Sequence, residues 1–316
     1  MRKVWNSAWL LLAAANLFWA GNIVLARGIA GEVPPITLAW LRWTGAFLVA
    51  IGFAVPSLRR DLPVMLRHWK IMLLLAATGI ASYNTMSYIG LTETTALNVL
   101  LLQSATPLII IVWAFLLFRD VPTPRQVGGV LLSLAGVAAI AAHGSLATLA
   151  TLTLNPGDVW VLVALAIYAV YCVILRRRPA VHPLSFLVAC MGLGSLMILP
   201  FMLGELAGGA AFHAHAATWL SVAYMALMPS FIAYLCFNRG IELIGGGPAG
   251  QSMHLMPLFG SILAVVFLHE AFRFYHLIGI VLIAGGILLA SVRLRRPAGV
   301  AAAPSRGSGA IPAAPE

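Results

Sequence analysis

The sequence predicts an all-α membrane protein in which ten transmembrane helices form two inverted five-helix repeats around a central cavity. Three observations lead to this fold class. The 316 residues are 61% hydrophobic and only 9% charged, whereas soluble domains carry about 25% charged residues. The apolar residues form continuous runs of about 20, the length that crosses a bilayer as a helix. Residues 69–141 also match residues 219–291 at a constant offset of 150 without a gap.

Helices are favoured over a barrel because lipid cannot satisfy free backbone groups, and the runs lack the alternation of barrel strands. The loops are short, so neighbouring helices are expected to be antiparallel. The predicted spans, in order, cover residues 7–29, 36–55, 70–91, 95–118, 125–142, 157–175, 183–203, 218–239, 246–268 and 274–292.

The first span follows Arg2 and Lys3, and its apolar run is too long for a cleaved signal peptide. The spans group into a first repeat at residues 1–145 and a second at 153–292. Residues 293–316, rich in Ala, Pro, Gly and Ser, are expected to be a disordered cytoplasmic tail.

The positive charges orient the chain. If the N-terminus is cytoplasmic, sixteen Lys and Arg residues fall in inner segments or the tail. Only Arg27 and Arg273 fall in outer segments, and Arg42 lies within the second span. This bias predicts ten spans with both ends in the cytoplasm. The composition therefore points to a lipid bilayer as partner and not to nucleic acid.

The repeat is predicted to be inverted, because each half contains an odd number of spans. Asp120 then lies in an inner loop, whereas its counterpart Glu270 lies in an outer loop. Pro107 and Pro257 interrupt corresponding spans of the two halves. Interrupted spans at matching positions are typical of secondary transporters, whose substrate site lies near the midplane between the repeats.

The chain resembles the EamA branch of the drug/metabolite transporter superfamily over about residues 7–292. The motifs that carry the resemblance are ANLFWAGN at 15–22, PP at 34–35, LRW at 41–43, YIGL at 88–91, TTA at 94–96, TPL at 106–108, NRGI at 238–241, PA at 248–249, MPL at 256–258 and HE at 269–270. The first half departs from the family pattern, because Arg119-Asp120 stands where a Glu usually precedes the fifth span. The resemblance implies a bacterial inner-membrane carrier of small metabolites, often an exporter of amino acids.

Polar residues at membrane depth are the candidate site residues, because each is costly there. Arg42 either faces the cavity and pairs with a substrate carboxylate or a helix end, or it extends to the outer interface. Tyr83, Asn84 and Tyr88 lie in the third span. Tyr234 and Asn238, in the eighth span, correspond to Asn84 and Tyr88 at the offset of 150. These Tyr and Asn residues either line the cavity for an amphipathic zwitterion or hold helices together.

The fourth and ninth spans carry Gln103 before Pro107, and Gln251 and His254 before Pro257. Each proline is expected to kink its helix and to free the carbonyl four residues earlier, of Gln103 and Met253. Such carbonyls either bind an ammonium group or water, or belong to a kink without a ligand.

Aromatic and amide side chains in the first and sixth spans complete the candidate substrate-binding set. Trp19, Asn22, Tyr168 and Tyr171 lie well inside their spans, as cavity walls or as packing. No Asp or Glu lies deep in a span, so transport is expected to be facilitative, or coupled through His254.

Other functional classes lack their residues. A metalloprotease needs H-E-x-x-H, and His269-Glu270 has no second His. A channel needs charged rings or a carbonyl filter, and a scaffold leaves the repeat unexplained. A sugar-phosphate or nucleotide-sugar carrier, the alternative within the superfamily, needs several cavity cations. We therefore expect a non-enzymatic carrier of a small molecule, monomeric or homodimeric, without cofactor or metal.

Overall fold

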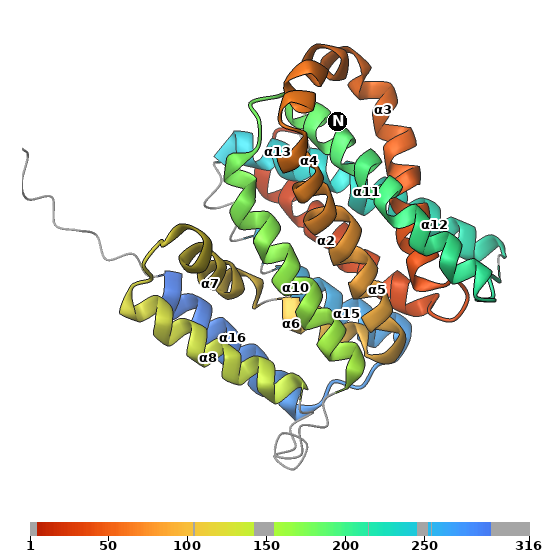
Figure 1. Cartoon of the computed structure of the whole chain (residues 1–316). Coiled ribbons are helices and arrows are strands. Elements are labelled where there is room, and N and C mark those ends of the chain that lie inside the picture. The colour runs from red at the N-terminus through yellow and green to blue at the C-terminus, as the bar shows by residue number, and fades with distance from the viewer. Residues whose placement is uncertain are drawn as a thin grey trace, which may run out of the picture.

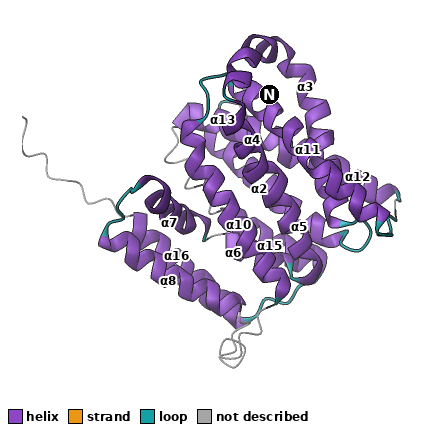
Figure 2. Ribbon diagram, in the orientation of Figure 1, coloured by secondary structure: helices purple, strands orange, loops and turns teal. Residues whose placement is uncertain are grey.

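The computed structural model describes residues 5–103, 105–141, 155–213, 215–244, 252–253 and 255–291. All secondary-structure elements in these ranges are helices, apart from one isolated bridge between Ala30 and Val33 (Figure 2). The prediction of an all-α membrane protein is confirmed. The predicted disordered tail lies outside the described residues.

The helices follow one another in the order α2 (Ala8–Gly28), α3 (Pro35–Arg67), α4 (Trp69–Ala76), η1 (Ala77–Ser82), α5 (Tyr83–Glu93), α6 (Ala96–Gln103), α7 (Thr106–Phe118), α8 (Pro124–Ala141), α10 (Pro156–Ile174), η2 (Leu175–Arg177), α11 (Pro183–Ala207), α12 (Ala216–Leu227), η3 (Met228–Ile232), α13 (Ala233–Ile244), α15 (Leu255–Leu268) and α16 (Phe274–Ser291). Here η1 and η3 are single π-helical turns, and η2 is a 3₁₀ turn.

Five helical stretches of the described chain are long and apolar enough to cross a membrane: 8–28, 35–67, 156–177, 183–207 and 216–244. A sixth is the pair α6 and α7, which is bent by 49°. Residues of the third, fifth, ninth and tenth predicted spans are also helical but do not meet this criterion. Length and composition therefore support six of the ten predicted spans.

The second predicted span ends earlier than its helix. Apolarity ends near residue 55, but α3 continues to Arg67 through Pro56 and Pro63. A proline removes one helical hydrogen bond without ending every helix. The polar extension carries Asp61, whose carboxylate accepts hydrogen bonds from the backbone N–H of His182 (2.9 Å) and from Arg60 Nε (3.1 Å).

The Asp61 carboxylate should make the stability of the folded protein depend on pH. The hydrogen bond from the His182 backbone, followed by smaller contributions that include Arg60, lowers the pKa of Asp61. A lowered pKa gives stability that is present above the unfolded pKa of about 4 and is lost as the pH falls through the folded value. Asp61→Asn should therefore lower the apparent Tm at neutral pH, and its difference from the wild type should shrink below about pH 4.

Thermal unfolding in detergent between neutral and acid pH tests this effect. Arg60→Gln is the control, because it keeps the backbone hydrogen bond and should keep most of the pH dependence. An Asp61→Asn difference that is constant across the pH range would contradict the assignment.

The contacts between helices are reciprocal between the two halves. The first helix of the chain, α2, packs on α13 and α15, and α10 packs on the corresponding helices of the first half, α5 and α7. Helices α8 and α16 lie side by side and form, with α7, a group at the lower left of Figure 1. A two-fold axis between the halves produces such pairing.

Individual residues that are 150 positions apart show the same two-fold relation. Ser133 Oγ donates to the carbonyl of Ile283, its counterpart at an offset of 150 (3.2 Å). Arg119 and His269, also 150 apart, both adopt left-handed backbone conformations, with φ of 59° and 54°. Each is followed by an acidic residue whose N–H donates to a carbonyl six residues earlier at 3.4 Å. The helices α7 and α15, which belong to the fourth and ninth predicted spans, therefore end in the same way.

The π-turns were not predicted. When shifted by 150, η1 covers residues 227–232, and η3 covers 228–232. Turns of this kind occur often at functional sites, because they re-aim the side chains that follow. Both turns lie within the third and eighth predicted spans, directly before α5 and α13.

Candidate functional site

Arg42 is the centre of the candidate site. Leu38, Arg42 and Ala46 are four residues apart on α3 and share one buried face. Arg42 is only 4% exposed, so its side chain points into the protein instead of extending to an interface. The small side chains of Ala46 and Ala50 on the same face are fully buried and allow close helix packing.

Three neutral side chains hold the Arg42 guanidinium. Its Nη1 donates to Asn84 Oδ1 (2.6 Å) and to the Tyr88 hydroxyl (2.8 Å). Its Nε donates to Ser230 Oγ (2.8 Å), and Ser230 in turn donates to the Met225 carbonyl (2.9 Å). Helix α5, in the first half of the chain, and the π-turn η3, in the second half, thus both accept hydrogen bonds from the guanidinium.

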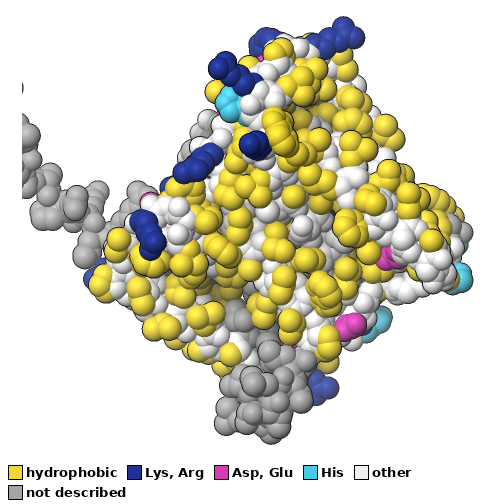
Figure 3. All heavy atoms as spheres, in the orientation of Figure 1, with side chains coloured by type: hydrophobic (Ala, Val, Ile, Leu, Met, Phe, Trp, Pro, Cys, Tyr) yellow, Lys and Arg dark blue, Asp and Glu magenta, His cyan; other side chains and the backbone are white. Residues whose placement is uncertain are grey.

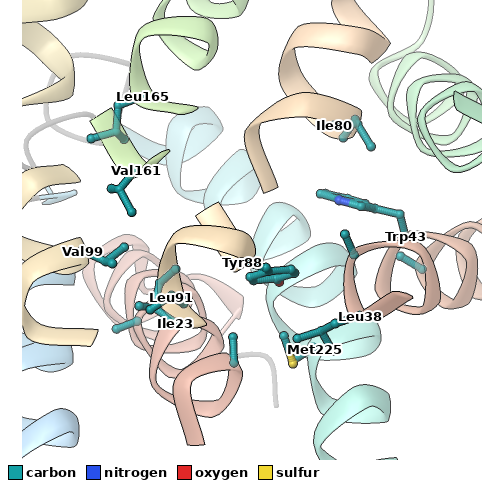
Figure 4. Close-up of a cluster of buried hydrophobic side chains, with 14 of the residues drawn as sticks. Ile23, Leu38, Trp43, Ile80, Tyr88, Leu91, Val99, Val161, Leu165 and Met225 are labelled. Atoms are coloured by element: carbon teal, nitrogen blue, oxygen red, sulfur yellow. The ribbon is translucent and has the colours of Figure 1, made fainter. Parts of the chain in front are cut away.

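Asn22 extends this network to α2. The Tyr88 hydroxyl donates to Asn22 Oδ1 at 2.9 Å. Figure 4 shows Tyr88 in the middle of the buried cluster, with Leu91 and Ile23 on one side and Leu38 and Met225 on the other. Side chains from α2, α5 and η3 therefore fix the direction of the guanidinium that α3 carries.

Arg42 has no carboxylate partner in the part of the chain that the structure describes. Its Nη2 makes no hydrogen bond to a described residue either. A buried cation without a counter-ion is costly, even when neutral groups accept its hydrogen bonds. This position is therefore suited to an anionic group that arrives from outside the protein.

Aromatic rings surround the cation. Tyr83 packs on Tyr168 with ring centroids 4.5 Å apart, and Tyr168 stacks on Tyr171 at 5.6 Å. Gln103 Nε2 donates to the Tyr83 hydroxyl (3.0 Å). This wall comes from α5, α6 and α10.

A second aromatic wall comes from α2 and α13. Trp19 contacts Tyr234 with centroids 5.6 Å apart, and its Nε1 donates to the Pro229 carbonyl of η3 (2.9 Å). Arg42 interacts electrostatically with both Tyr83 and Tyr234, one from each wall. The walls and the cation therefore belong to one site, with apolar faces beside a fixed positive charge.

One described residue of the predicted set does not join this site. Asn238 is exposed on α13, so the pair Tyr234 and Asn238 does not mirror Asn84 and Tyr88. Gln251 and His254 lie outside the described residues.

A helix break lies just before Pro107, and the carbonyls that were expected to be freed before Pro107 and Pro257 are occupied. The break between α6 and α7 comes just before Pro107, and the Thr106 hydroxyl donates to the Gln103 carbonyl (2.6 Å). Before Pro257, the N–H of Met256 donates to the Met253 carbonyl (3.1 Å). The expectation that these carbonyls are unpaired was wrong, because neighbouring groups within each turn satisfy them.

Sequence reasoning missed Ser230 and Asn16. Ser230 follows Pro229 inside an apolar span, and this interruption was the available signal. Asn16 is fully buried, and its Nδ2 donates to the Leu12 carbonyl (2.8 Å) and to Ser252 Oγ (3.2 Å). It connects α2 to the segment that precedes α15.

Two surface cavities lie away from Arg42. One, of about 250 Å³, is apolar and lies between Trp40, Phe212 and Trp219. The other, of about 420 Å³, lies beside Arg27 and Glu205. Neither combines a buried charge with aromatic walls, so the chemistry at Arg42 identifies the stronger candidate site.

A model of the EamA-like transporter family matches residues 6–142 and 155–292. The chain is 25% identical over 292 residues to the transporter YyaM of Bacillus subtilis, covering 92% of this chain and 95% of YyaM. It is 27% identical over 288 residues to a transporter of Archaeoglobus fulgidus, with coverages of 90% and 97%.

Two further matches bear on function and fold. A probable terminal-alkyne amino-acid exporter of Streptantibioticus cattleyicolor is 26% identical over 300 residues, covering 92% of this chain and 94% of the exporter. A crystal structure of a protein 23% identical to the chain aligns with a TM-score of 0.59, over 90% of this chain and 98% of that one. That last likeness shows the fold.

Proposed function

Because this chain belongs to the EamA-like transporter family, we propose that it exports neutral or aromatic amino acids, or similar small amphipathic metabolites, by alternating access. The observation that carries the substrate class is the buried Arg42, which has neutral partners and no carboxylate among the described residues. A substrate carboxylate supplies the missing negative charge and accepts from Nη2, the guanidinium nitrogen that makes no hydrogen bond to a described residue.

The remaining surfaces suit the rest of an amino acid. The Tyr83, Tyr168 and Tyr171 wall and the Trp19 and Tyr234 wall offer ring faces to an apolar side chain. Ring faces also attract an ammonium group. The site thereby matches a molecule with one carboxylate, one cation and an apolar body.

A sugar-phosphate or nucleotide-sugar substrate is less compatible with this site. Phosphate recognition uses several Lys or Arg side chains. Arg42 is the one buried Lys or Arg in the described ranges. One guanidinium matches one carboxylate, which favours the amino-acid class.

The topology belongs to the proposal as well. In Figure 3 a broad hydrophobic surface separates an end rich in Lys and Arg from an end where Asp, Glu and His side chains appear. The positive-inside rule then assigns the Lys- and Arg-rich end, with both termini, to the cytoplasm of a bacterial inner membrane. Residues 1–145 and 153–292 form the two inverted repeats, and alternating access exchanges their conformations.

Export is the proposed direction. The relative whose name describes a probable terminal-alkyne amino-acid exporter supports it, since that substrate also carries a carboxylate and an ammonium group.

Counterflow in proteoliposomes tests this function. Vesicles are loaded in turn with each of a panel of amino acids, amines and sugar phosphates, and the entry of the same labelled compound is measured. We expect stimulated entry of neutral or aromatic amino acids and none of sugar phosphates. Counterflow of sugar phosphates without amino-acid counterflow would overturn the proposal.

A further inference from the structure

A second buried polar cluster lies where the first turn of α10 meets α6 and α16. It consists of Thr94, Asn98, Asp158 and His276, which are between 0% and 3% exposed. Asp158 is in the first turn of α10 and has no exposed surface. The sequence places this acid at the end of a span, and its complete burial was not foreseen. The structure therefore contains a buried carboxylate that can serve ion coupling.

Hydrogen bonds connect the four side chains in a chain. The Thr94 hydroxyl donates to Asp158 Oδ1 (2.5 Å). Asn98 Nδ2 lies 3.4 and 3.3 Å from the two Asp158 carboxylate oxygens. His276 Nε2 lies 3.0 Å from Asn98 Oδ1, while the backbone N–H of Arg273 donates to His276 Nδ1 (3.0 Å).

This pattern assigns the proton of a neutral His276 to Nε2, because Nδ1 is already an acceptor. The Asn98 amide then bridges the imidazole and the carboxylate, with its oxygen accepting and its nitrogen donating. An ionised carboxylate in this place is stabilised by the donors that face it, as buried charges require.

Glu270 and Arg273 are charged residues beside the cluster. Glu270 accepts the N–H groups of Ala96 and Leu97 (both 2.9 Å) and so caps α6. Tyr275 interacts electrostatically with Arg273 and Asp158, and its ring lies 4.1 Å from that of His276. The cluster thus fastens α6 of the first half to α10 and α16 of the second.

The opposite end of the pseudo-symmetric molecule lacks this carboxylate. At the offset of 150, Asp158 corresponds to Ala8, and His276 corresponds to Gln126. Gln126 Oε1 accepts the N–H of Thr123 (2.7 Å), as His276 accepts that of Arg273. The acid at that end, Asp120, forms an exposed ion pair with Arg176 (3.0 Å). That end also holds a buried acid, Asp61, whose carboxylate accepts from the backbone N–H of His182 and from Arg60 Nε instead of from Thr and Asn side chains. The two ends therefore carry acids in different surroundings and should respond differently to a proton.

We propose that Asp158 is the proton-binding residue that couples transport to a proton gradient. The ionised carboxylate accepts hydrogen bonds from Thr94 and Asn98 and keeps this end closed. One proton from the outer solution neutralises it, weakens both hydrogen bonds and lets this end open; after this end closes and the other end opens, the proton leaves to the cytoplasm, so that each cycle moves one proton inward. This inference rests on the proposed transport function, and it replaces the expectation of facilitative transport or coupling through His254.

Thiol labelling of purified protein in detergent tests the opening without a substrate. Cys172, Cys190 and Cys236 are replaced by Ser, and Ala96→Cys places one thiol at the fully buried start of α6. Phe272→Cys in a parallel protein provides a reference, because Phe272 is 47% exposed and corrects for the pH dependence of thiol reactivity. We expect the labelling ratio of the two to rise as the pH falls, by up to about tenfold per pH unit for one linked proton.

Substitutions test which side chain binds the proton that controls the labelling ratio. Asp158→Asn should give a high ratio that does not depend on pH, and Asp120→Asn, the exposed acid, should keep the pH dependence. His276→Gln, which introduces the residue found at position 126, should keep it too.

If Asp158→Asn does not fold, Thr94→Val serves in its place: it removes a donor to the ionised carboxylate and should move the midpoint of the pH dependence to higher pH. A pH-independent wild-type ratio, a midpoint unmoved by Thr94→Val, or a pH dependence lost in His276→Gln but kept in Asp158→Asn, would overturn the proposal.

Transport separates this inference from the proposed function. Proteoliposomes receive a mixture of labelled neutral amino acids, either for counterflow or for accumulation driven by an imposed pH gradient. The wild type should show both, whereas Asp158→Asn should retain measurable counterflow and lose accumulation. Wild-type counterflow without any effect of the gradient would overturn the role of Asp158 and leave the proposed function standing. If the wild type shows no counterflow, the proposed function fails, and the labelling experiment still decides the role of Asp158.

Discussion

Arg42→Gln should raise the KM for counterflow of a neutral amino acid by about 10- to 100-fold. The expected loss is that of a hydrogen bond to a charged group, about 1.5–3 kcal/mol. The variant should fold, because it removes a buried charge that has no counter-ion among the described residues. The Tyr88 and Ser230 hydroxyls also keep their hydrogen bonds to Asn22 and to the Met225 carbonyl. Initial rates over a range of labelled leucine concentrations measure the effect.

Two further substitutions on the same helix separate charge from geometry. Arg42→Lys keeps the charge but not the planar guanidinium, whose Nη1 and Nε are held by protein acceptors, and it should give an intermediate KM. Arg59→Gln removes an exposed arginine from the polar extension of α3 and should leave the KM unchanged. An Arg42→Gln variant with the KM of the wild type would show that Arg42 does not bind the substrate.

Gly286→Ala should destabilise the protein much more than Gly285→Ala. A Cβ at Gly286 would overlap the Ser133 hydroxyl and the Gly129 carbonyl of α8, whereas one at Gly285 meets a Leu132 methyl group at an ordinary 3.4 Å. Both changes gain helix propensity, about 1 kcal/mol. Only Gly286→Ala forces α8 and α16 apart, at a cost of about 1–3 kcal/mol for overpacking.

The apparent Tm in detergent measures this difference, and about 1–2 °C is expected for each kcal/mol in a chain of 316 residues. Gly136→Ala is a symmetric companion, because its Cβ would lie 2.9 Å from the Gly279 carbonyl. Equal melting temperatures for the Gly285 and Gly286 variants would contradict the close packing of α8 on α16.

The fold class could be predicted from the sequence because apolar run length and the offset of 150 are direct consequences of the bilayer and the repeat. Helix bounds were harder. Apolarity reports where lipid ends, and α3 continues beyond that point as far as Arg67. The π-turns were missed, since they arise from the packing of η1 and η3 against neighbouring helices and leave no period in the sequence.

The candidate site was predicted in part. Arg42, Asn84, Tyr88 and Asn22 were identified by the cost of polarity at membrane depth, and the structure joins them by hydrogen bonds. Ser230 was missed because a serine is not costly enough to be conspicuous. The burial of Asp158 was missed because it results from the contact of α10 with α6, which sequence position at the end of a span does not reveal.

The most direct test of substrate recognition by Arg42 compares L-leucine with L-leucinamide, which lacks the carboxylate. Each competes with labelled leucine for counterflow in proteoliposomes that contain the wild type or Arg42→Gln. The wild type should prefer leucine by about 10- to 100-fold, and Arg42→Gln should lose most of this preference. If the ratio of the two inhibition constants is the same in both proteins, Arg42 does not recognise the carboxylate.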